Sequence, residues 1–142
     1  MVKQTIQDIS ERLQRAGIPA TLQRVAIGEV LLAQPIHLRA DEVLERVREI
    51  LPEVSRATVY NTLKLFREAG LVKELIVDAE RIVFDSNTEP HYHFYDVDTG
   101  TVLDVGAGEL QVIGSPKLPN GLELEQVDVI IRVRGNRSGG SA

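Results

Sequence analysis

The chain has 142 residues, of which 43% are hydrophobic and 26% are charged, the balance of an ordinary soluble globular protein. No apolar run approaches the roughly 20 residues that cross a bilayer, which excludes a membrane-spanning protein. Cysteine is absent, which excludes a disulfide framework and thiolate zinc sites. The net charge of -5 is uneven, because residues 1–70 carry ten Lys and Arg against nine Asp and Glu, whereas residues 71–142 carry six against twelve. The N-terminus lacks the basic start and apolar stretch of a secretory signal, so we expect a cytoplasmic protein.

Three segments in the first half carry apolar residues at helical spacing. Residues 3–16 form the first, which the breakers within residues 17–19 end. Thr21 is suited to cap a second helix, which stops before Pro35. A third helix is expected over about residues 40–50. Each of these helices is predicted to bury one face.

A fourth helix and the segment after it give the clearest pattern. Ser55 is a good N-cap residue, and Gly70 is suited to end the helix. The apolar positions at i, i+4 and i+7 are Val59, Leu63 and Phe66. Residues 71–77 and 81–84 are then short and rich in β-branched residues, with a turn at residues 78–80, which predicts a hairpin. Helices followed directly by a hairpin are the element order of a winged helix-turn-helix, in which the hairpin is the wing.

The second half is predicted to be a small sheet. Residues 91–97 and 101–105 favour strands on either side of a turn, and residues 124–133 alternate enough apolar side chains for a third strand. Residues 106–121 are rich in Gly and Pro, so we expect a loop there, with a short strand around residues 110–113.

These elements predict an α+β protein with two domains. Residues 1–85 form an N-terminal winged-helix DNA-binding domain, and residues 86–90, Ser-Asn-Thr-Glu-Pro, form a hinge. Residues 91–134 form a small C-terminal domain that is mostly β. Residues 135–142 have the composition of a disordered tail.

The outer face of the fourth helix carries residues suited to DNA. At 100° per residue, Tyr60, Asn61 and Lys64 lie opposite the apolar stripe. Arg56 lies in the first turn, where a recognition helix of this class points into the major groove. Any exposed helix face is polar, so the hairpin that follows is what favours DNA over mere solvation. The predicted DNA contacts, including earlier residues near the phosphates, are Arg15, Gln23, Arg24, Arg56, Ala57, Thr58, Tyr60, Asn61 and Lys64.

Several segments together resemble a known family. Residues 55–63, SRATVYNTL, followed by residues 66–72, FREAGLV, are similar to the recognition helix and first wing strand of the ferric uptake regulator family. Further similar segments are residues 16–17, 21–24, 37–43, 84–85 and 91–93. The similarity covers about residues 10–105, although Leu22 stands where many members have proline. The resemblance implies a homodimeric, metal-dependent repressor of a double-stranded DNA operator, with residues 91–134 as its dimerisation and metal-binding domain.

The three histidines of the chain point to a metal site. His91 and His93, two apart on a predicted strand, project from one face, and Asp104 on the next strand can come beside them. A lone His-X-His is equally well explained as two ordinary histidines. The resemblance also assigns His37 and Asp85 to the family's regulatory metal site, so ligands from both halves would hold one ion. Imidazole and carboxylate ligands without thiolate suit Fe²⁺, Mn²⁺ or Zn²⁺, and we expect Fe²⁺ or Mn²⁺, with Zn²⁺ binding in vitro.

The chain departs from the resemblance after the His-X-His. Many family members hold a structural zinc there with Cys-X-X-Cys, whereas this chain has Asp96 and Thr99. We therefore expect no structural zinc of that kind. The dimer is expected to be held by apolar residues of the sheet, such as Val127, Val129 and Ile131.

Two branches of the family and two other classes of protein stay open at this point. In the peroxide-sensing branch, bound Fe²⁺ lets peroxide oxidise a ligand histidine, here His37 or His91. The second branch is an iron-responsive regulator found in some proteobacteria. A small metalloenzyme that activates water is a less favoured alternative, as is a winged-helix module that binds protein partners. The sequence favours a repressor of peroxide-stress or iron-homeostasis genes and does not separate the two branches.

Overall fold

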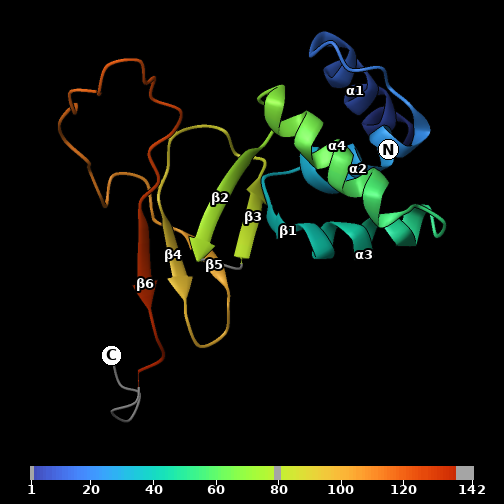
Figure 1. The fold of residues 1–142 in the computed structure, drawn as a ribbon. Helices are drawn as coiled ribbons and strands as arrows, with labels where there is room; N and C mark the ends of the chain where they lie inside the picture. Colours follow the sequence, from blue (N-terminus) through green and yellow to red (C-terminus); the bar gives the residue numbers. More distant parts are fainter. Residues whose placement is uncertain (1, 79–80, 137–142) are drawn as a thin grey trace. The chain divides into compact units, whose positions relative to one another are not determined.

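The computed structural model describes residues 2–78 and 81–136, with side chains from Thr5 onward (Figure 1). The chain divides into two compact units, residues 1–89 and 90–142. All the described helices lie in the first unit, and the described part of the second unit contains strands and loops. This order confirms the predicted α+β class. None of the described helices is long and apolar enough to span a bilayer.

Helices and one sheet make up the first unit, and a second sheet makes up the other. The elements of the first unit are α1 (Val2–Arg15), α2 (Leu22–Leu32), β1 (His37–Arg39), α3 (Ala40–Ile50), α4 (Arg56–Glu68), β2 (Lys73–Asp78) and β3 (Arg81–Asp85). Those of the second unit are β4 (His93–Asp96), β5 (Val102–Asp104) and β6 (Ile130–Val133).

The helix boundaries follow the predicted capping residues. Thr21 Oγ1 accepts the N–H of Arg24 at 3.3 Å before α2, and Ser55 Oγ accepts the N–H of Thr58 at 3.1 Å before α4. Gly70 follows α4 with a φ of 76°, a left-handed conformation that costs residues with a Cβ roughly 1–2 kcal/mol. The N-termini of α2 and α4 and the C-terminus of α4 therefore lie where local chemistry predicts.

The helices close over one hydrophobic core. Its most deeply buried side chains include Leu13, Ile27, Leu31, Val43, Val47, Val59, Leu63 and Phe66. The apolar stripe predicted for α4 is thus confirmed as its buried face. Between α1 and α2 the packing is close, because a Cβ added to Gly28 would lie 2.5 Å from Ile9 Cγ2. The two helices therefore meet at a position that has no room for a side chain.

The sheet of the first unit has the order β1-β3-β2, with antiparallel neighbours. The β2–β3 hairpin is the predicted wing, although Ala79 and Glu80 of its predicted turn lie outside the described residues. The sequence did not predict β1, because three residues are too few to show a strand period. This strand places His37 opposite Asp85 and buries Leu38.

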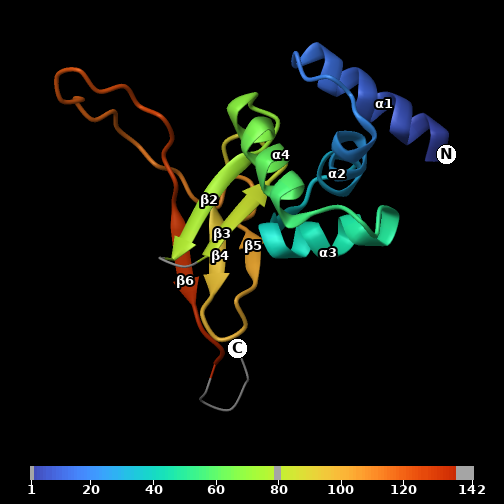
Figure 2. The ribbon, with the colours of Figure 1, turned by 45° about the vertical axis from the view of Figure 1, so that its right-hand side comes forward.

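The sheet of the second unit has the order β5-β4-β6 (Figure 1). The antiparallel β4–β5 hairpin is as predicted, and β6 pairs with β4 in parallel, with Ile130 opposite His93. A parallel neighbour needs a long connection. The chain makes that connection in a loop over residues 105–129, the orange to red trace without helix or strand in Figure 2.

Of two further strand predictions, the one over residues 110–113 is wrong and the one over residues 124–133 is right only in its last part. Residues 110–113 form no strand, and residues 124–133 form one only from Ile130 onward. Residues 124–128 break the alternation, because Glu125 and Gln126 are adjacent polar residues, and within the described chain no other strand pairs with them. A strand requires a neighbouring backbone for its hydrogen bonds as well as alternation.

The predicted hinge and tail lie at the two ends of the second unit. The boundary between the units falls after Glu89, within residues 86–90. Residues 137–142 of the predicted disordered tail lie outside the described residues. Gly135, near its start, donates its N–H to Asp98 Oδ2 at 2.9 Å. The chain directly after β6 is therefore attached to the β4–β5 turn.

Candidate metal centre and nucleic-acid interface

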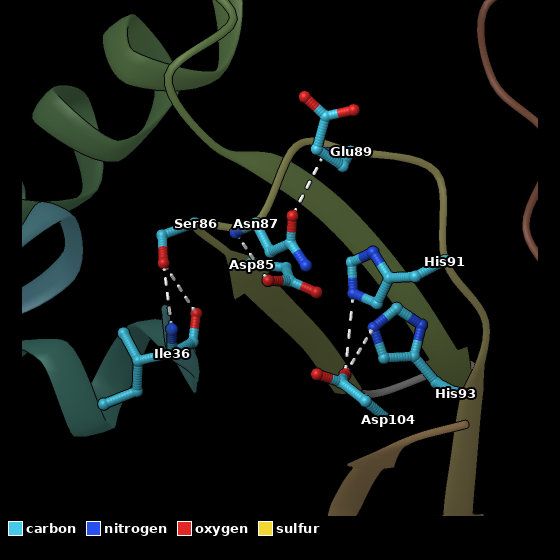
Figure 3. Close-up of polar contacts among 8 residues, drawn as sticks. All are labelled: Ile36, Asp85, Ser86, Asn87, Glu89, His91, His93 and Asp104. Atoms are coloured by element: carbon cyan, nitrogen blue, oxygen red, sulfur yellow. Dashed lines mark hydrogen bonds and ion pairs between the residues drawn. The ribbon is translucent and has the colours of Figure 1, made fainter. Parts of the chain in front are cut away.

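Three of the predicted metal ligands meet in the second unit. The β4–β5 register places His93 opposite Asp104, and His91 precedes β4 by one residue. Asp104 Oδ1 lies 3.5 Å from His91 Nε2 and 3.4 Å from His93 Nε2 (Figure 3). The two imidazole centroids are 4.4 Å apart. His93 is buried and Asp104 is exposed, so the carboxylate lies at the solvent side of the two rings.

The donor set of this cluster fits a divalent cation. Two imidazole nitrogens and a carboxylate oxygen, one from each residue, lie within 4.8 Å of one another. Ligand atoms about 3.4 Å apart are expected when bonds of roughly 2.1 Å meet one ion at tetrahedral angles. The two contacts of Asp104 with the imidazoles have this spacing. The cluster therefore has both the ligand chemistry and the spacing of a partial metal site, to which further ligands can be added.

The other two predicted ligands are paired in the first unit. His37 of β1 lies directly opposite Asp85 of β3, so the two side chains share one face of the sheet. Asp85 is 2% exposed and His37 is half-buried. Burial of a carboxylate is costly unless hydrogen bonds or cations compensate for its lost hydration. The five predicted ligands therefore fall into two groups, one in each unit.

Two residues directly after β3 contact the ends of these strands, and the sequence analysis missed both. Asn87 donates its N–H to Asp85 Oδ1 at 2.9 Å (Figure 3). Ser86 Oγ accepts the N–H of Ile36 at 2.9 Å and donates to the carbonyl oxygen of Ile36 at 3.1 Å. The Asp85 contact has a local signal, because Asp often accepts from the backbone two residues on. The Ser86 contact joins residues 50 positions apart and has no such signal.

The positions predicted to replace thiolates close the β4–β5 turn. Asp96 Oδ1 accepts the N–H of Asp98 at 2.9 Å and that of Thr99 at 3.3 Å. Thr99 Oγ1 accepts the N–H of Thr101 at 3.2 Å. Side-chain hydrogen bonds to the backbone therefore stabilise this turn.

The outer face of α4 presents most of the predicted DNA contacts to solvent. Exposed residues are Arg56, Ala57, Tyr60, Asn61 and Lys64. Arg56 Nη1 donates to Tyr60 Oη at 3.1 Å, and the guanidinium carbon lies 5.7 Å from the centre of the tyrosine ring. Thr58 is half-buried, and its hydroxyl accepts from Ser55 Oγ at 2.9 Å. The helix therefore presents a polar face, while its Thr58 hydroxyl takes part in the N-terminal cap.

The remaining predicted DNA contacts lie around the α1–α2 connection. Arg15 ends α1 and Gln23 lies in the first turn of α2, and both are exposed. Arg24 donates from Nη1 to the carbonyl oxygen of Pro19 at 3.1 Å. This contact orders the guanidinium at the start of α2. Binding of DNA by these residues stays a prediction.

Comparison with known proteins gives consistent matches over most of the chain. Residues 15–132 match the ferric uptake regulator family. The peroxide-responsive repressor PerR of Staphylococcus aureus (strain Mu50 / ATCC 700699) is 34% identical over 112 residues, which are 79% of this chain and 76% of that protein.

Solved structures show the same fold. The ferric uptake regulator from Pseudomonas aeruginosa with manganese is 28% identical, with a TM-score of 0.65 over 90% of this chain and 98% of that one. The Vibrio cholerae ferric uptake regulator is 24% identical, with a TM-score of 0.67 over 89% and 98% of the two chains. Family members are metal-dependent transcriptional regulators that bind DNA operators, typically as dimers. This chain belongs to the ferric uptake regulator family and is a transcriptional regulator, not an enzyme.

Proposed function

We propose that this chain is a homodimeric repressor that binds its operator when His37, Asp85, His91, His93 and Asp104 hold one Fe²⁺ or Mn²⁺ ion. The observation that carries the proposal is the contact of one Asp104 oxygen with Nε2 of both His91 and His93. A divalent cation supplies a positive centre that all five side chains can ligate at once. Two imidazoles and one carboxylate converge in the second unit.

The proposed switch follows from the division of the ligands between the two units. His37 and Asp85 belong to the unit that carries α4, and the other three ligands belong to the second unit. Shared ligation would restrict how one unit moves against the other and would thereby set the spacing between the two α4 helices of a dimer. Linkage then requires operator DNA to tighten metal binding by the same factor by which metal tightens DNA binding.

The proposed dimer uses the apolar side chains that the second unit leaves exposed. Leu122, Leu124 and Val127 are 62%, 58% and 57% exposed. These side chains lie on the segment that precedes β6. Apolar groups gathered in this way mark an interaction surface, and a second copy of the chain would cover them. Val129 and Ile131, which are half-buried, continue this surface along the strand.

The effector is proposed to be peroxide, because the repressor that is 34% identical is peroxide-responsive. In this form of the proposal, the ring of His37 or His91 gains one oxygen atom from peroxide, and the other oxygen leaves as water. Mass spectrometry of Fe²⁺-loaded protein after peroxide treatment tests it. We expect one added oxygen atom on either histidine. An unchanged mass of both would reject peroxide sensing and leave iron sensing.

Metal dependence is tested with a matched pair of carboxylate variants. Asp104→Asn removes a proposed ligand charge, whereas Asp98→Asn changes a carboxylate in the turn of the same sheet and keeps an acceptor for the Gly135 N–H. Manganese binding is measured by equilibrium dialysis with elemental analysis. DNA binding is measured by mobility shift on an operator selected from random sequences with Mn²⁺ and wild-type protein.

We expect Asp104→Asn to lose at least about tenfold in Mn²⁺ affinity, together with the metal-dependent shift. Asp98→Asn is expected to behave like the wild type, and a chelator is expected to reverse the wild-type shift. Equal operator binding with and without metal would reject the switch. Equal losses of Mn²⁺ affinity in the two variants would reject Asp104 as a ligand.

A further inference from the structure

We infer that Arg56 and Tyr60 form one reading unit on α4, in which Arg56 positions the tyrosine so that its hydroxyl donates to an acceptor on a base edge. The inference rests on the proposed operator binding and goes beyond it, because it names the class of base atom that is read. The geometric basis is the Nη1 to Oη hydrogen bond of 3.1 Å across one helical turn.

Tyr60 borders a cavity, where a neighbouring residue can position its ring. Together with Leu63 of α4 and with Ile82 and Phe84 of the wing, it lines a cavity of about 300 Å³. Tyr60, which is 42% exposed and borders such a space, has room for more than one side-chain conformation. The guanidinium carbon of Arg56 lies 5.7 Å from the ring centre, within the range of a cation–π contact, and restrains the ring.

The direction of the hydrogen bond leaves the hydroxyl proton of Tyr60 for a contact with DNA. A guanidinium has five N–H donors and no acceptor, so Tyr60 Oη must accept from Arg56. The hydroxyl proton is then available to a partner outside the protein. In the major groove the suitable acceptors are N7 of purines, O6 of guanine and O4 of thymine, whereas the amino groups of cytosine and adenine are donors. The pair therefore favours an acceptor at its base position.

A phosphate contact by Arg56 is the competing explanation, and it predicts different data. Loss of one phosphate contact weakens binding to all DNA sequences alike and lowers the slope of log affinity against log salt by roughly 0.9. Such a contact would also be independent of the tyrosine hydroxyl. The reading unit instead predicts that Arg56 and Tyr60 Oη are energetically coupled and that base preference at one position depends on both.

The test is a double-mutant cycle on the full chain with Mn²⁺, using the operator selected with the wild type. The variants are Arg56→Ala, Tyr60→Phe and the double variant, with Arg56→Lys as the conservative replacement and Lys117→Gln as a charge control in the 105–129 loop. Affinity is measured by fluorescence anisotropy for the operator, for its single-base substitutions and for random-sequence DNA. Far-UV circular dichroism verifies that each variant keeps its helices.

We expect each single variant to lose about tenfold in operator affinity, and the double variant to lose little more than either single one. Base preference at one position should flatten in both single variants. Arg56→Lys should recover part of the affinity, because an ammonium can also donate to Oη. Lys117→Gln should match the wild type.

Two results overturn the inference in distinguishable ways. Losses that multiply, to about a hundredfold in the double variant, or losses that are equal on random DNA, would show that Arg56 acts apart from Tyr60. A wild-type protein that selects no sequence at all would instead reject the proposed operator binding, and the reading unit with it.

Discussion

The two units differ in how completely each buries its own apolar side chains. The first unit buries the apolar faces of its helices in one core that includes Phe66, Leu63 and Val43. The second unit leaves Ile113 84% exposed, and its loop also exposes Leu122 and other apolar side chains. The helical unit is therefore stabilised by contacts within itself, whereas the loop of the second unit leaves apolar surface that a partner can cover.

The largest expected effect is a cavity in the helical core. Phe66→Ala should lower the free energy of unfolding by about 3–5 kcal/mol, because Phe66 is fully buried in the core. Urea unfolding followed by far-UV circular dichroism measures this loss, since all the described helices lie in the first unit. A loss below about 1 kcal/mol would contradict a self-contained core.

A smaller effect is expected where two helices touch. Gly28→Ala should destabilise the protein by about 1–3 kcal/mol, because the new methyl group collides with Ile9 Cγ2 and outweighs the helix propensity of alanine. The same unfolding measurement applies. In an Ile9→Ala background the added methyl group should cost less. An equal cost in both backgrounds would place the strain elsewhere.

Loss of a helix cap should lower the free energy of unfolding by less than the two changes above. Ser55→Ala removes the side-chain acceptor for the N–H of Thr58 and should lower the free energy of unfolding by about 1 kcal/mol. Ser115→Ala, in the exposed loop of the second unit, is the matched control and should leave it unchanged. If both variants unfolded alike, the cap would contribute nothing to the stability of α4.

The smallest effect on folding is expected in the second unit, where association should change instead. Val127→Ser replaces a side chain that is 57% exposed, so the free energy of unfolding measured on the helices should stay within about 0.5 kcal/mol. The dimer dissociation constant should rise about tenfold, because an apolar contact is lost in each copy. Sedimentation velocity over a range of concentrations measures it. An unchanged dissociation constant would remove Val127 from the interface.

Much of the first unit was predictable because its signals are local. Thr21 and Ser55 cap their helices through hydrogen bonds that span three residues, and Gly70 takes the left-handed conformation expected after α4. The hairpin of β2 and β3 is also a contact between neighbours in sequence. By contrast, β1 pairs with a strand more than forty positions away, as the register of His37 with Asp85 shows. No local pattern predicts this pairing.

The candidate metal site shows the same difference between contacts of sequence neighbours and long-range contacts. His91, His93 and Asp104 could be placed together from the sequence, because strand alternation and a short hairpin bring them to one face. His37 and Asp85 were assigned by resemblance to the family, and the register of β1 with β3 then supplied a physical reason for their pairing. Contacts between sequence neighbours are encoded in periodicity and capping, whereas pairing across long separations is decided by which partners the folded chain brings together. Residues 124–128 were predicted as part of a strand and, within the described chain, form none, because no other strand pairs with them.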